Sequence, residues 1–208
     1  SPNLYERYTW STGGMAMAMN ALVNDANGYV GNLNLKPEVA HTLSITADWH
    51  DAAQEQWGVK VTPYYTHVRD YIDVRRCTSV YAACTGVNPT TTTRFVNLEF
   101  INQSARLYGM EVSGHFPLAK TGDYGNFTAK GALNYTDGKN QTTGDNLYNI
   151  MPLNAKLAVV QQWGNWTNTA EVHLVDAKKD VSQGRNEMKT GGYGLLNLRS
   201  SYELKQVR

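Results

Sequence analysis

The sequence has little charge, few cysteines and no long apolar run. Charged residues make up 18% of its 208 residues, against about 25% in an average soluble domain, and Asn, Thr, Ser, Gly and Tyr take their place. This composition argues against disorder and against a helical bundle, and it suits β-strands. The net charge of +1 provides no electrostatic footprint for nucleic acid. No run reaches the roughly 18 apolar residues of a membrane helix. A membrane β-barrel stays open, because its strands are apolar only at alternate positions.

Motifs for catalysis and metal binding are also missing. There is no Gly-x-Ser-x-Gly, no His-Glu-x-x-His and no phosphate loop, so an enzyme is the weakest class of function and no residue is assigned as catalytic. We expect no signal peptide within this sequence, because its start has neither a basic stretch nor an apolar one. The two cysteines, Cys77 and Cys84, cannot complete a structural zinc site. We expect a disulfide between them, which implies an oxidising compartment.

Alternation of apolar and polar residues is the dominant pattern, and it predicts strands. Strong alternation marks 43–50, 57–62, 127–136, 166–174 and 196–202, and weaker alternation covers about 95–117 and 154–163. We therefore predict seven antiparallel strands in one curved sheet, each pairing with its neighbours in sequence. The side chains expected to face lipid are Leu43, Ile45, Val59, Val61, Phe127, Leu133, Val172, Leu174, Leu196 and Leu198.

The connections between these strands alternate in length. Long polar links cover about 75–93, 137–152 and 179–191, and short links fall at 51–56, about 118–125, and 164–165. One end of the sheet should therefore carry large loops and the other tight turns, as in outer-membrane barrels. The connections of a soluble sandwich need not sort by length.

The tryptophans favour the membrane interpretation. Trp49, Trp57, Trp163 and Trp166 all lie at strand ends next to short turns, which is the position of an interfacial aromatic girdle. A sandwich core would hold them in mid-strand. Seven strands cannot close as a bacterial single-chain barrel, where the number is even, so we expect the chain to be a portion of a larger barrel.

Several short motifs resemble those of TonB-dependent receptors, in the same order along the chain. In the first of them, Pro37 forces an extended entry into a strand and Lys36 and Glu38 are interpreted as interfacial charges. In the third, Gly109 and Glu111 are expected on the lumen side. The stretches that carry them are Gly28–Glu38 (GN-x-x-LKPE), Tyr64–Ile72 (Y-x-x-x-x-x-D-x-I), Tyr108–Glu111 (x-G-x-E), Met151–Lys156 (x-P-x-x-K) and Gly191–Tyr193 (P-G-Y).

The resemblance implies an all-β fold: a transmembrane antiparallel β-barrel, of which this chain is an incomplete run of about seven late strands from a 22-stranded plugged barrel. Residues 1–208 would be part of one barrel domain, with the plug and the closing strands absent. The implied protein is an active transport receptor of the bacterial outer membrane, without a prosthetic group. Its implied partners are the TonB complex, acting through the absent plug, and outer-membrane lipid and lipopolysaccharide.

Within that family, the segments 4–11, 15–20 and 27–31 resemble the copper-receptor branch. Met15, Met17 and Met19 alternate along the chain, so an extended loop would present three thioethers on one side, and thioethers select Cu(I). Copper is then the expected transported ligand, with these methionines as metal contacts. The alternative is that they fill gaps in a packed loop. The four histidines at 50, 67, 115 and 173 have no metal partner at i+2 or i+4 and are interpreted as strand or interface residues.

Three other functions remain open at this level. A siderophore or cobalamin receptor would share the same motifs. A small structural or adhesive outer-membrane barrel would need an eighth strand within residues 1–30. A soluble lectin-like sandwich would bury the apolar rows between two sheets.

Overall fold

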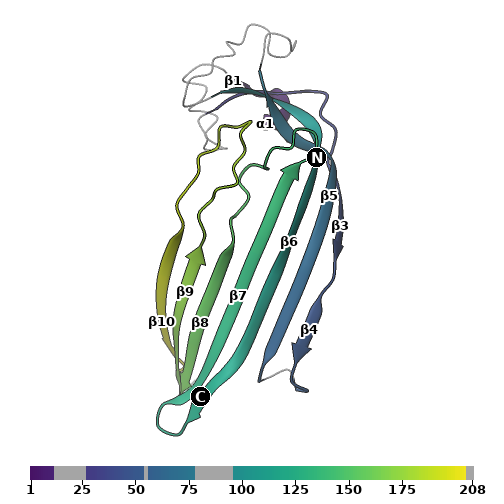
Figure 1. Cartoon of the computed structure of the whole chain (residues 1–208). Helices are drawn as coiled ribbons and strands as arrows, with labels where there is room; N and C mark the ends of the chain where they lie inside the picture. The colour runs from purple at the N-terminus through teal and green to yellow at the C-terminus, as the bar shows by residue number, and fades with distance from the viewer. Residues whose placement is uncertain (12–26, 54–55, 78–95, 205–208) are drawn as a thin grey trace.

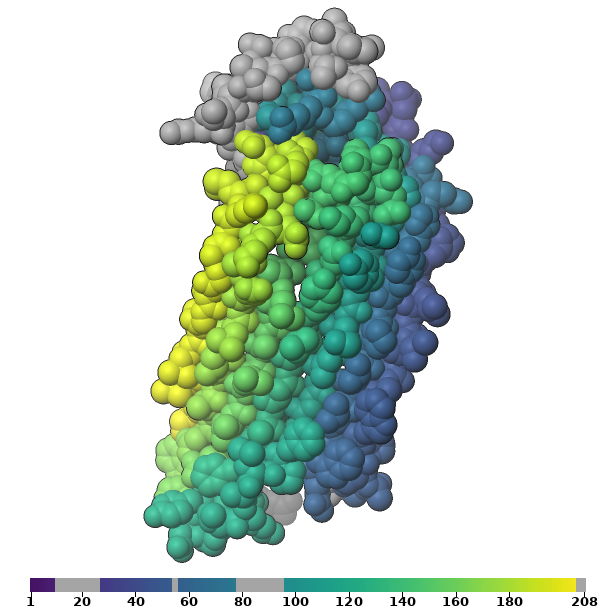
Figure 2. Space-filling model, in the orientation of Figure 1, coloured from purple at the N-terminus to yellow at the C-terminus, as the bar shows by residue number. Residues whose placement is uncertain are grey.

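The computed structural model describes residues 1–11, 27–53, 56–77 and 96–204. They form one curved sheet whose long strands run side by side, with the large loops gathered at one end (Figure 1). The space-filling view shows the same strands as a continuous wall (Figure 2). No helix in the described part of the chain is long and apolar enough to cross a bilayer.

The sheet is an antiparallel meander, as predicted. Its long strands pair in the order β5–β6–β7–β8–β9–β10, and β3 and β4 both pair with β5. Counted as one strand interrupted at Ile45 and Thr46, β3 and β4 complete the seven predicted strands. The bounds are β3 Val39–Ser44, β4 Ala47–His50, β5 Gly58–Arg76, β6 Asn97–Thr121, β7 Gly125–Asn140, β8 Asn154–Trp163, β9 Trp166–Val175 and β10 Tyr193–Tyr202.

Several strands are longer than the alternation predicted. β5 and β7 continue toward the loop end, where β7 reaches Asn140, inside a range predicted as loop, whereas β6 is extended at the short-turn end, to Thr121. In this upper part polar residues occupy both faces of β7, as Thr136, Asp137 and Lys139 illustrate. The alternation of apolar and polar residues therefore ends before the strand does, because this pattern requires one apolar face.

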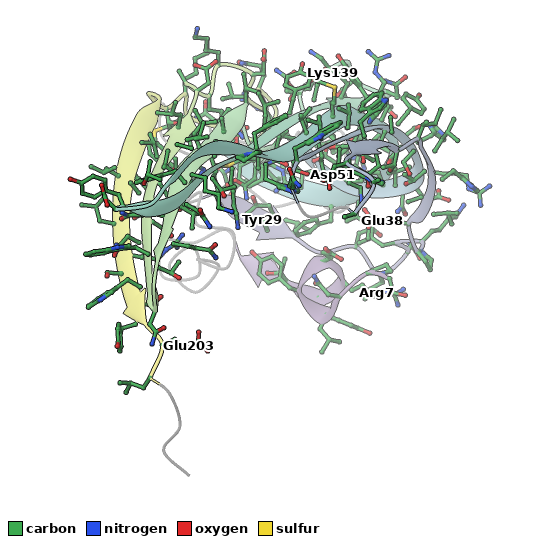
Figure 3. The ribbon with its side chains drawn as sticks, turned by 90° about the horizontal axis from the view of Figure 1, so that it is seen from below. Arg7, Tyr29, Glu38, Asp51, Lys139 and Glu203 are labelled. Carbon is green, nitrogen blue, oxygen red and sulfur yellow. The ribbon has the colours of Figure 1, made fainter. Side chains whose placement is uncertain are left out.

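The two faces of the sheet have opposite character. Lys139 lies on the convex side and Tyr29 within the concavity (Figure 3). Because side chains alternate along a strand, Leu133 shares the convex face with Lys139, and the register places all ten predicted lipid-facing residues there. Leu198 is 73% exposed and Leu43 69%. An apolar surface of this extent requires an apolar surrounding.

Aromatic side chains gather at the short-turn end, as expected for a girdle. The ring of Trp57 stacks on that of Phe116 with centroids 6.4 Å apart. Trp166 packs against Tyr202 at 4.9 Å. The other two tryptophans at this end, Trp49 and Trp163, are more than half exposed. Rings held at one level outside the sheet suit the headgroup region of a membrane.

The N-terminal segment was not predicted to have regular structure. Its elements are helix α1 (Leu4–Tyr8) and strands β1 (Trp10–Ser11) and β2 (Gly28–Val30). β2 pairs with β6 in parallel, against residues 97–99. β7 pairs with β6 only from Ala105 onward, so the upper edge of β6 is open, and β2 satisfies its backbone groups.

The Lys36-Pro37-Glu38 segment is attached to a bulge in β5. The Glu38 carboxylate accepts a hydrogen bond from Ile72 N at 2.8 Å. The Asn102 amide donates to Asp70 O at 2.7 Å and to Lys36 O at 3.0 Å, and its oxygen accepts from Lys36 N. The pairing of β5 with β6 shifts register between Val68 and Tyr71, and these contacts satisfy the groups released there. Glu38, which is exposed, thus also has a local structural role at the bulge.

Candidate functional site

The concave face, called the lumen face here, is polar along most of its length. Alternation and register bring acidic residues such as Glu111 and Glu171, and basic ones such as Lys130, into neighbouring rows. A hollow of about 710 Å³ lies against its lower half, lined by Asp48, His50, Lys60, His115 and Lys130 among others. Gly109 and Glu111 lie on this face, as the sequence predicted. Such a surface holds water and presents positive and negative groups side by side.

Two histidines flank Gly58 on this face. A side chain at Gly58 would have its Cβ 3.2 Å from Cε1 of His115 and 3.6 Å from Cβ of His50. Nδ1 of His50 donates to the carbonyl of Asp51 at 2.8 Å, since a carbonyl only accepts. His67 lies on β5 and His173 on β9, 6.5 Å from the ring of Tyr193. Within the described ranges, no three His, Cys, Asp or Glu side chains are grouped to hold a metal ion.

At the long-loop end, residues 27–38, 140–153 and 176–192 pack together over the upper ends of β5 and β6. We call this assembly the loop cluster. Its apolar centre is formed by Tyr29, fully buried, which stacks on Phe100 at 5.1 Å, with Leu98 and Val74 beside it. Tyr5 of α1 contacts both rings. The loops at this end therefore have a core of their own.

A buried polar network joins the loops to the strands. The Arg185 guanidinium donates to Asp73 Oδ1 at 3.3 Å and to the hydroxyl of Tyr29 at 3.1 Å. The Asn140 amide donates to Asp73 Oδ2 at 2.8 Å and also to Gln103. The side chains of Arg185 and Asp73 are 9% and 10% exposed. A buried charge pair is tolerated when further hydrogen bonds satisfy both groups.

Tyr71 lies beside this network, above the part of β5 that carries the apolar band. Its side chain packs against the cluster of Val68, Ala105 and Leu147. Burial, followed by the negative charge of Asp73, raises the pKa of the Tyr71 hydroxyl from 10.0 to about 12. The phenol stays neutral, because ionisation would place a second negative charge close to Asp73.

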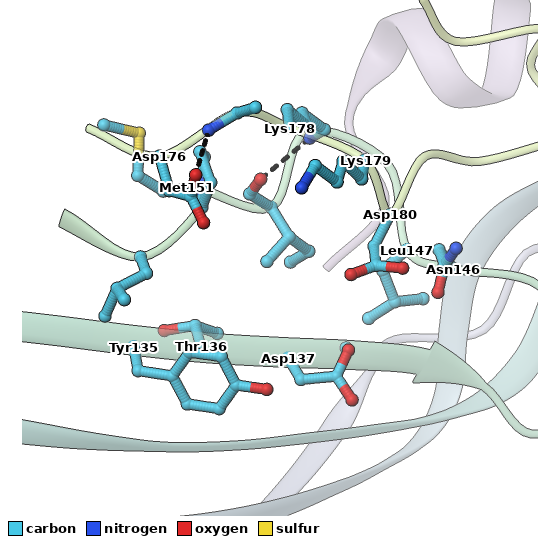
Figure 4. Close-up of a pocket in the computed structure, with 15 residues that line it drawn as sticks. Tyr135, Thr136, Asp137, Asn146, Leu147, Met151, Asp176, Lys178, Lys179 and Asp180 are labelled. Carbon is cyan, nitrogen blue, oxygen red and sulfur yellow. Dashed lines mark hydrogen bonds between the residues drawn. The ribbon is translucent and has the colours of Figure 1, made fainter. Parts of the chain in front are cut away.

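Two acidic residues hold the loop that follows β9. Asp145 accepts from the backbone N–H groups of Gln183 and Gly184 at 2.9 and 2.8 Å. Glu187 forms an ion pair with Lys178 at 2.8 Å, and Lys178 also donates to Ile150 O (Figure 4). A small cavity of about 120 Å³ lies between this loop and β7. Its volume and its lining suit a few water molecules.

The sequence-predicted site residues lie mostly outside the described ranges. Met15, Met17 and Met19 do, and so does Cys84. Cys77 is described: it is 4% exposed at the end of β5, and its N–H donates to Asn97 O at 2.9 Å. The methionine contacts and the Cys77–Cys84 disulfide therefore stay predictions.

The polar network was missed by the sequence analysis. Arg185 is separated from Asp73 by 112 positions and from Asn27 by 158. No local pattern marks residues that meet only after the sheet has formed. The loop itself is rich in charge, since Arg185 is one of seven charged residues between 176 and 192, so composition did not single it out.

The profile of the family described as "TonB dependent receptor-like, beta-barrel" matches residues 1–208. The chain belongs to this family. Its members are transport receptors of the Gram-negative outer membrane that work with TonB. The alternative of a soluble lectin-like sandwich is therefore excluded. The observation of one sheet, rather than two packed sheets, agrees with this exclusion.

Solved structures of the family have the same fold. The copper transporter OprC superposes with a TM-score of 0.70 at 18% identity, covering 99% of this chain and 28% of that one. The FrpB iron transporter from Neisseria meningitidis gives 0.54 at 10% identity over 86% of this chain and 26% of that one. FpvAI, in a complex with pyocin S2, gives 0.54 at 12% identity, covering 82% and 22%.

A curated relative matches at the sequence level. The heme/hemopexin utilization protein C of Haemophilus influenzae is 28% identical over 159 residues, which is 72% of this chain and 21% of that protein. The chain thus spans about a fifth to just over a quarter of the length of the proteins that it resembles.

Proposed function

We propose that the receptor containing this chain imports copper across the outer membrane, with energy passed from the inner membrane through TonB. In this proposal the chain supplies part of the barrel wall and of the extracellular entrance. The copper passes the loop cluster first and the lumen face afterwards. The Met15, Met17 and Met19 thioethers are the first soft ligands that it meets, and copper enters as Cu(I).

The position of β1 and β2 is the observation that supports this proposal best. The segment with the three methionines connects these two strands, and both lie at the long-loop end, beside the buried Tyr29. The likeness to OprC over 99% of the chain adds support. Capture at this site is weak, because a transported ion must also leave.

Heme is a second candidate cargo. The relative from Haemophilus influenzae is named for heme and hemopexin utilization, and its likeness is in sequence rather than in fold alone. The two candidates differ in the donor that they require, since heme iron favours imidazole ligands and Cu(I) favours thioethers.

Uptake by cells that carry the full-length receptor tests both candidates. We expect cells with the parent receptor to accumulate copper at low external concentration in a TonB-dependent manner. The triple variant M15L/M17L/M19L should accumulate several-fold less, because Leu keeps the size and apolarity of Met but lacks the sulfur. Growth on hemin as the iron source is measured in parallel.

The chain offers a matched control, M110L/M151L/M188L, which removes the other three methionines. Copper uptake should stay near the parent level in this control. Equal uptake by the parent and by M15L/M17L/M19L would assign the triplet to packing alone. Growth on hemin without any copper uptake would replace copper with heme as the cargo.

A further inference from the structure

Two histidines of the lumen face lie on either side of a glycine. His50 of β4 pairs with Gly58 of β5, and Gly58 pairs with His115 of β6. Directly paired residues project from the same face of a sheet, so both imidazoles rise from the lumen face with no side chain between them. We call His50 and His115 the histidine pair. The two backbones are separated by two strand spacings of about 4.8 Å each.

The ring of His115 uses the space that the glycine leaves open. Its Cε1 lies 3.2 Å and its Nδ1 3.7 Å from the position that a Cβ of residue 58 would occupy. Cβ of His50 is 3.6 Å from the same position. The imidazole of His115 therefore leans over β5 toward β4, and both side chains reach one common point. A shared ligand requires this convergence.

The orientation of His50 is fixed by the turn that follows it. Its Nδ1 donates to the carbonyl of Asp51 at 2.8 Å. The Asp51 carboxylate accepts from the N–H groups of Gln56 and Trp57 at 3.0 and 3.1 Å, so a closed turn holds the acceptor in place. With the proton on Nδ1, the lone pair of the neutral ring is on Nε2. Metal-bound histidines have this arrangement, in which a carbonyl orients the ring through the other nitrogen.

The position of the pair along the wall follows from its neighbours in sequence. Trp57 precedes Gly58, Phe116 follows His115, and their rings stack on the opposite face as part of the girdle. The histidine pair therefore lies at the short-turn end of the lumen face, where it lines the hollow of about 710 Å³. In an outer-membrane barrel the short turns face the periplasm, so cargo passes this part of the wall last.

The charges around the pair weaken the binding of a cation without preventing it. Asp48 lies two positions before His50, on the same face, and it is the one acidic group among the described residues that line the hollow. Lys130 pairs directly with His115, and Lys60 pairs with Asp48. The two ammonium groups repel a bound cation. An ion held here is released more easily than an ion held by three or four ligands.

We propose that His50 and His115 together bind a copper ion at the short-turn end of the lumen face. Imidazole is a suitable ligand for copper, and one nitrogen from each ring forms a two-nitrogen site whose other positions are open to water. The identity of the ion rests on the proposed function. The site adds a second contact for the cargo, after the entrance with Met15, Met17 and Met19.

Copper binding by the purified full-length receptor in detergent tests the pair. Cu(II) is the probe, because thioethers select Cu(I) and the three methionines then contribute little. In calorimetric titrations, H50A and H115A should each bind Cu(II) at least about tenfold more weakly, since even the loss of a group that only orients a metal ligand costs a factor of about 10 to 100. The matched control is H173A, which removes another histidine of the lumen face and should bind as the parent does.

Electron paramagnetic resonance of the bound Cu(II) identifies the ligands directly. The parent spectrum should show coupling to two imidazole nitrogens, and the spectra of H50A and H115A should show coupling to one. Thermal unfolding verifies that each variant is folded, and H50Q or H115Q replaces an alanine variant that is not.

Two further variants keep both ligands and change their surroundings. G58A places a Cβ 3.2 Å from Cε1 of His115, which displaces the ring, so Cu(II) binding should weaken several-fold. K130Q removes the positive charge next to His115, so Cu(II) binding should become several-fold tighter. Weaker binding in K130Q would overturn the proposal, because it would assign the hollow to an anion.

Three other results would also overturn the proposal. They are equal affinities of the parent, H50A and H115A, an equal loss of affinity in H173A, and a parent spectrum without nitrogen coupling. Uptake of copper by cells is measured separately. If cells take up no copper while H50A and H115A still lose Cu(II) binding, the proposed cargo fails and the metal site stands.

Discussion

The Asp73 carboxylate in β5 binds the Arg185 guanidinium from the loop after β9, with 3.3 Å between Oδ1 and Nη2. The second oxygen of Asp73 accepts from Asn140, so one side chain connects β5, the end of β7 and a distant loop. Both charged groups are almost fully buried. The loops at this end are consequently attached to the sheet at a defined point.

Breaking this pair should loosen the loop cluster. D73N keeps the shape of the side chain but leaves the Arg185 charge buried without its counter-ion, which costs about 3 kcal/mol. We expect a lower free energy of unfolding and faster protease cleavage within 176–192. E171Q is the matched control, because its partner Arg199 is 65% exposed and such pairs contribute at most about 1 kcal/mol. Equal effects of D73N and E171Q would contradict the assigned role.

Gly109 should not tolerate a side chain. A Cβ at this position would collide with the carbonyl of Tyr135 and with the Tyr64 ring, whose hydroxyl is bonded to Thr136 at 2.6 Å. G109A should lower the free energy of unfolding by about 1–3 kcal/mol or more, as overpacking does. G122A is the control, because nothing lies within 4 Å of its Cβ position. Urea unfolding in detergent measures both variants, and a G109A as stable as G122A would show that β5 and β7 can separate locally.

The Tyr71 hydroxyl predicts a loss of stability in alkali. Its pKa is about 12 in the folded protein and 10.0 without perturbation, so the unfolded state releases this proton first as the pH rises. The contribution is fully present below pH 10 and declines up to about pH 12, by about 2–3 kcal/mol in all. Y71F should remove this part of the pH dependence, while Y124F, at an exposed position, should not. Tyrosinate absorbance that titrates fully near pH 10 would refute the burial argument.

Cys77 and Cys84 are predicted to form a disulfide on the extracellular side. A bond that closes so short a loop stabilises the folded state by about 2.5 kcal/mol in the chain-entropy model. Alkylation of the unreduced receptor, followed by mass spectrometry, should leave both residues unmodified. The C77S/C84S variant should match the reduced parent in thermal stability. Two alkylated thiols without reduction would disprove the bond.

The strands could be predicted where one face is apolar and the other polar. Leu43, Val61 and Leu196 belong to rows with this alternation, and all three lie on the convex face as expected. The prediction failed at Asp137 and Lys139, because the strand there extends beyond the apolar band. It failed also for β2, whose three residues form a strand only because β6 offers an open edge.

The sequence by itself determined the meander, the two faces, the girdle end and the family, because each depends on periodicity, on turn length or on motifs within a few dozen residues. Tertiary structure alone decided that Glu38 and Asn102 satisfy a bulge and that Arg185 is buried on Asp73. These relationships depend on strand register and on contacts between segments about 30 to more than 100 positions apart. Register is fixed only when the whole sheet has formed, so no local stretch of the sequence contains it.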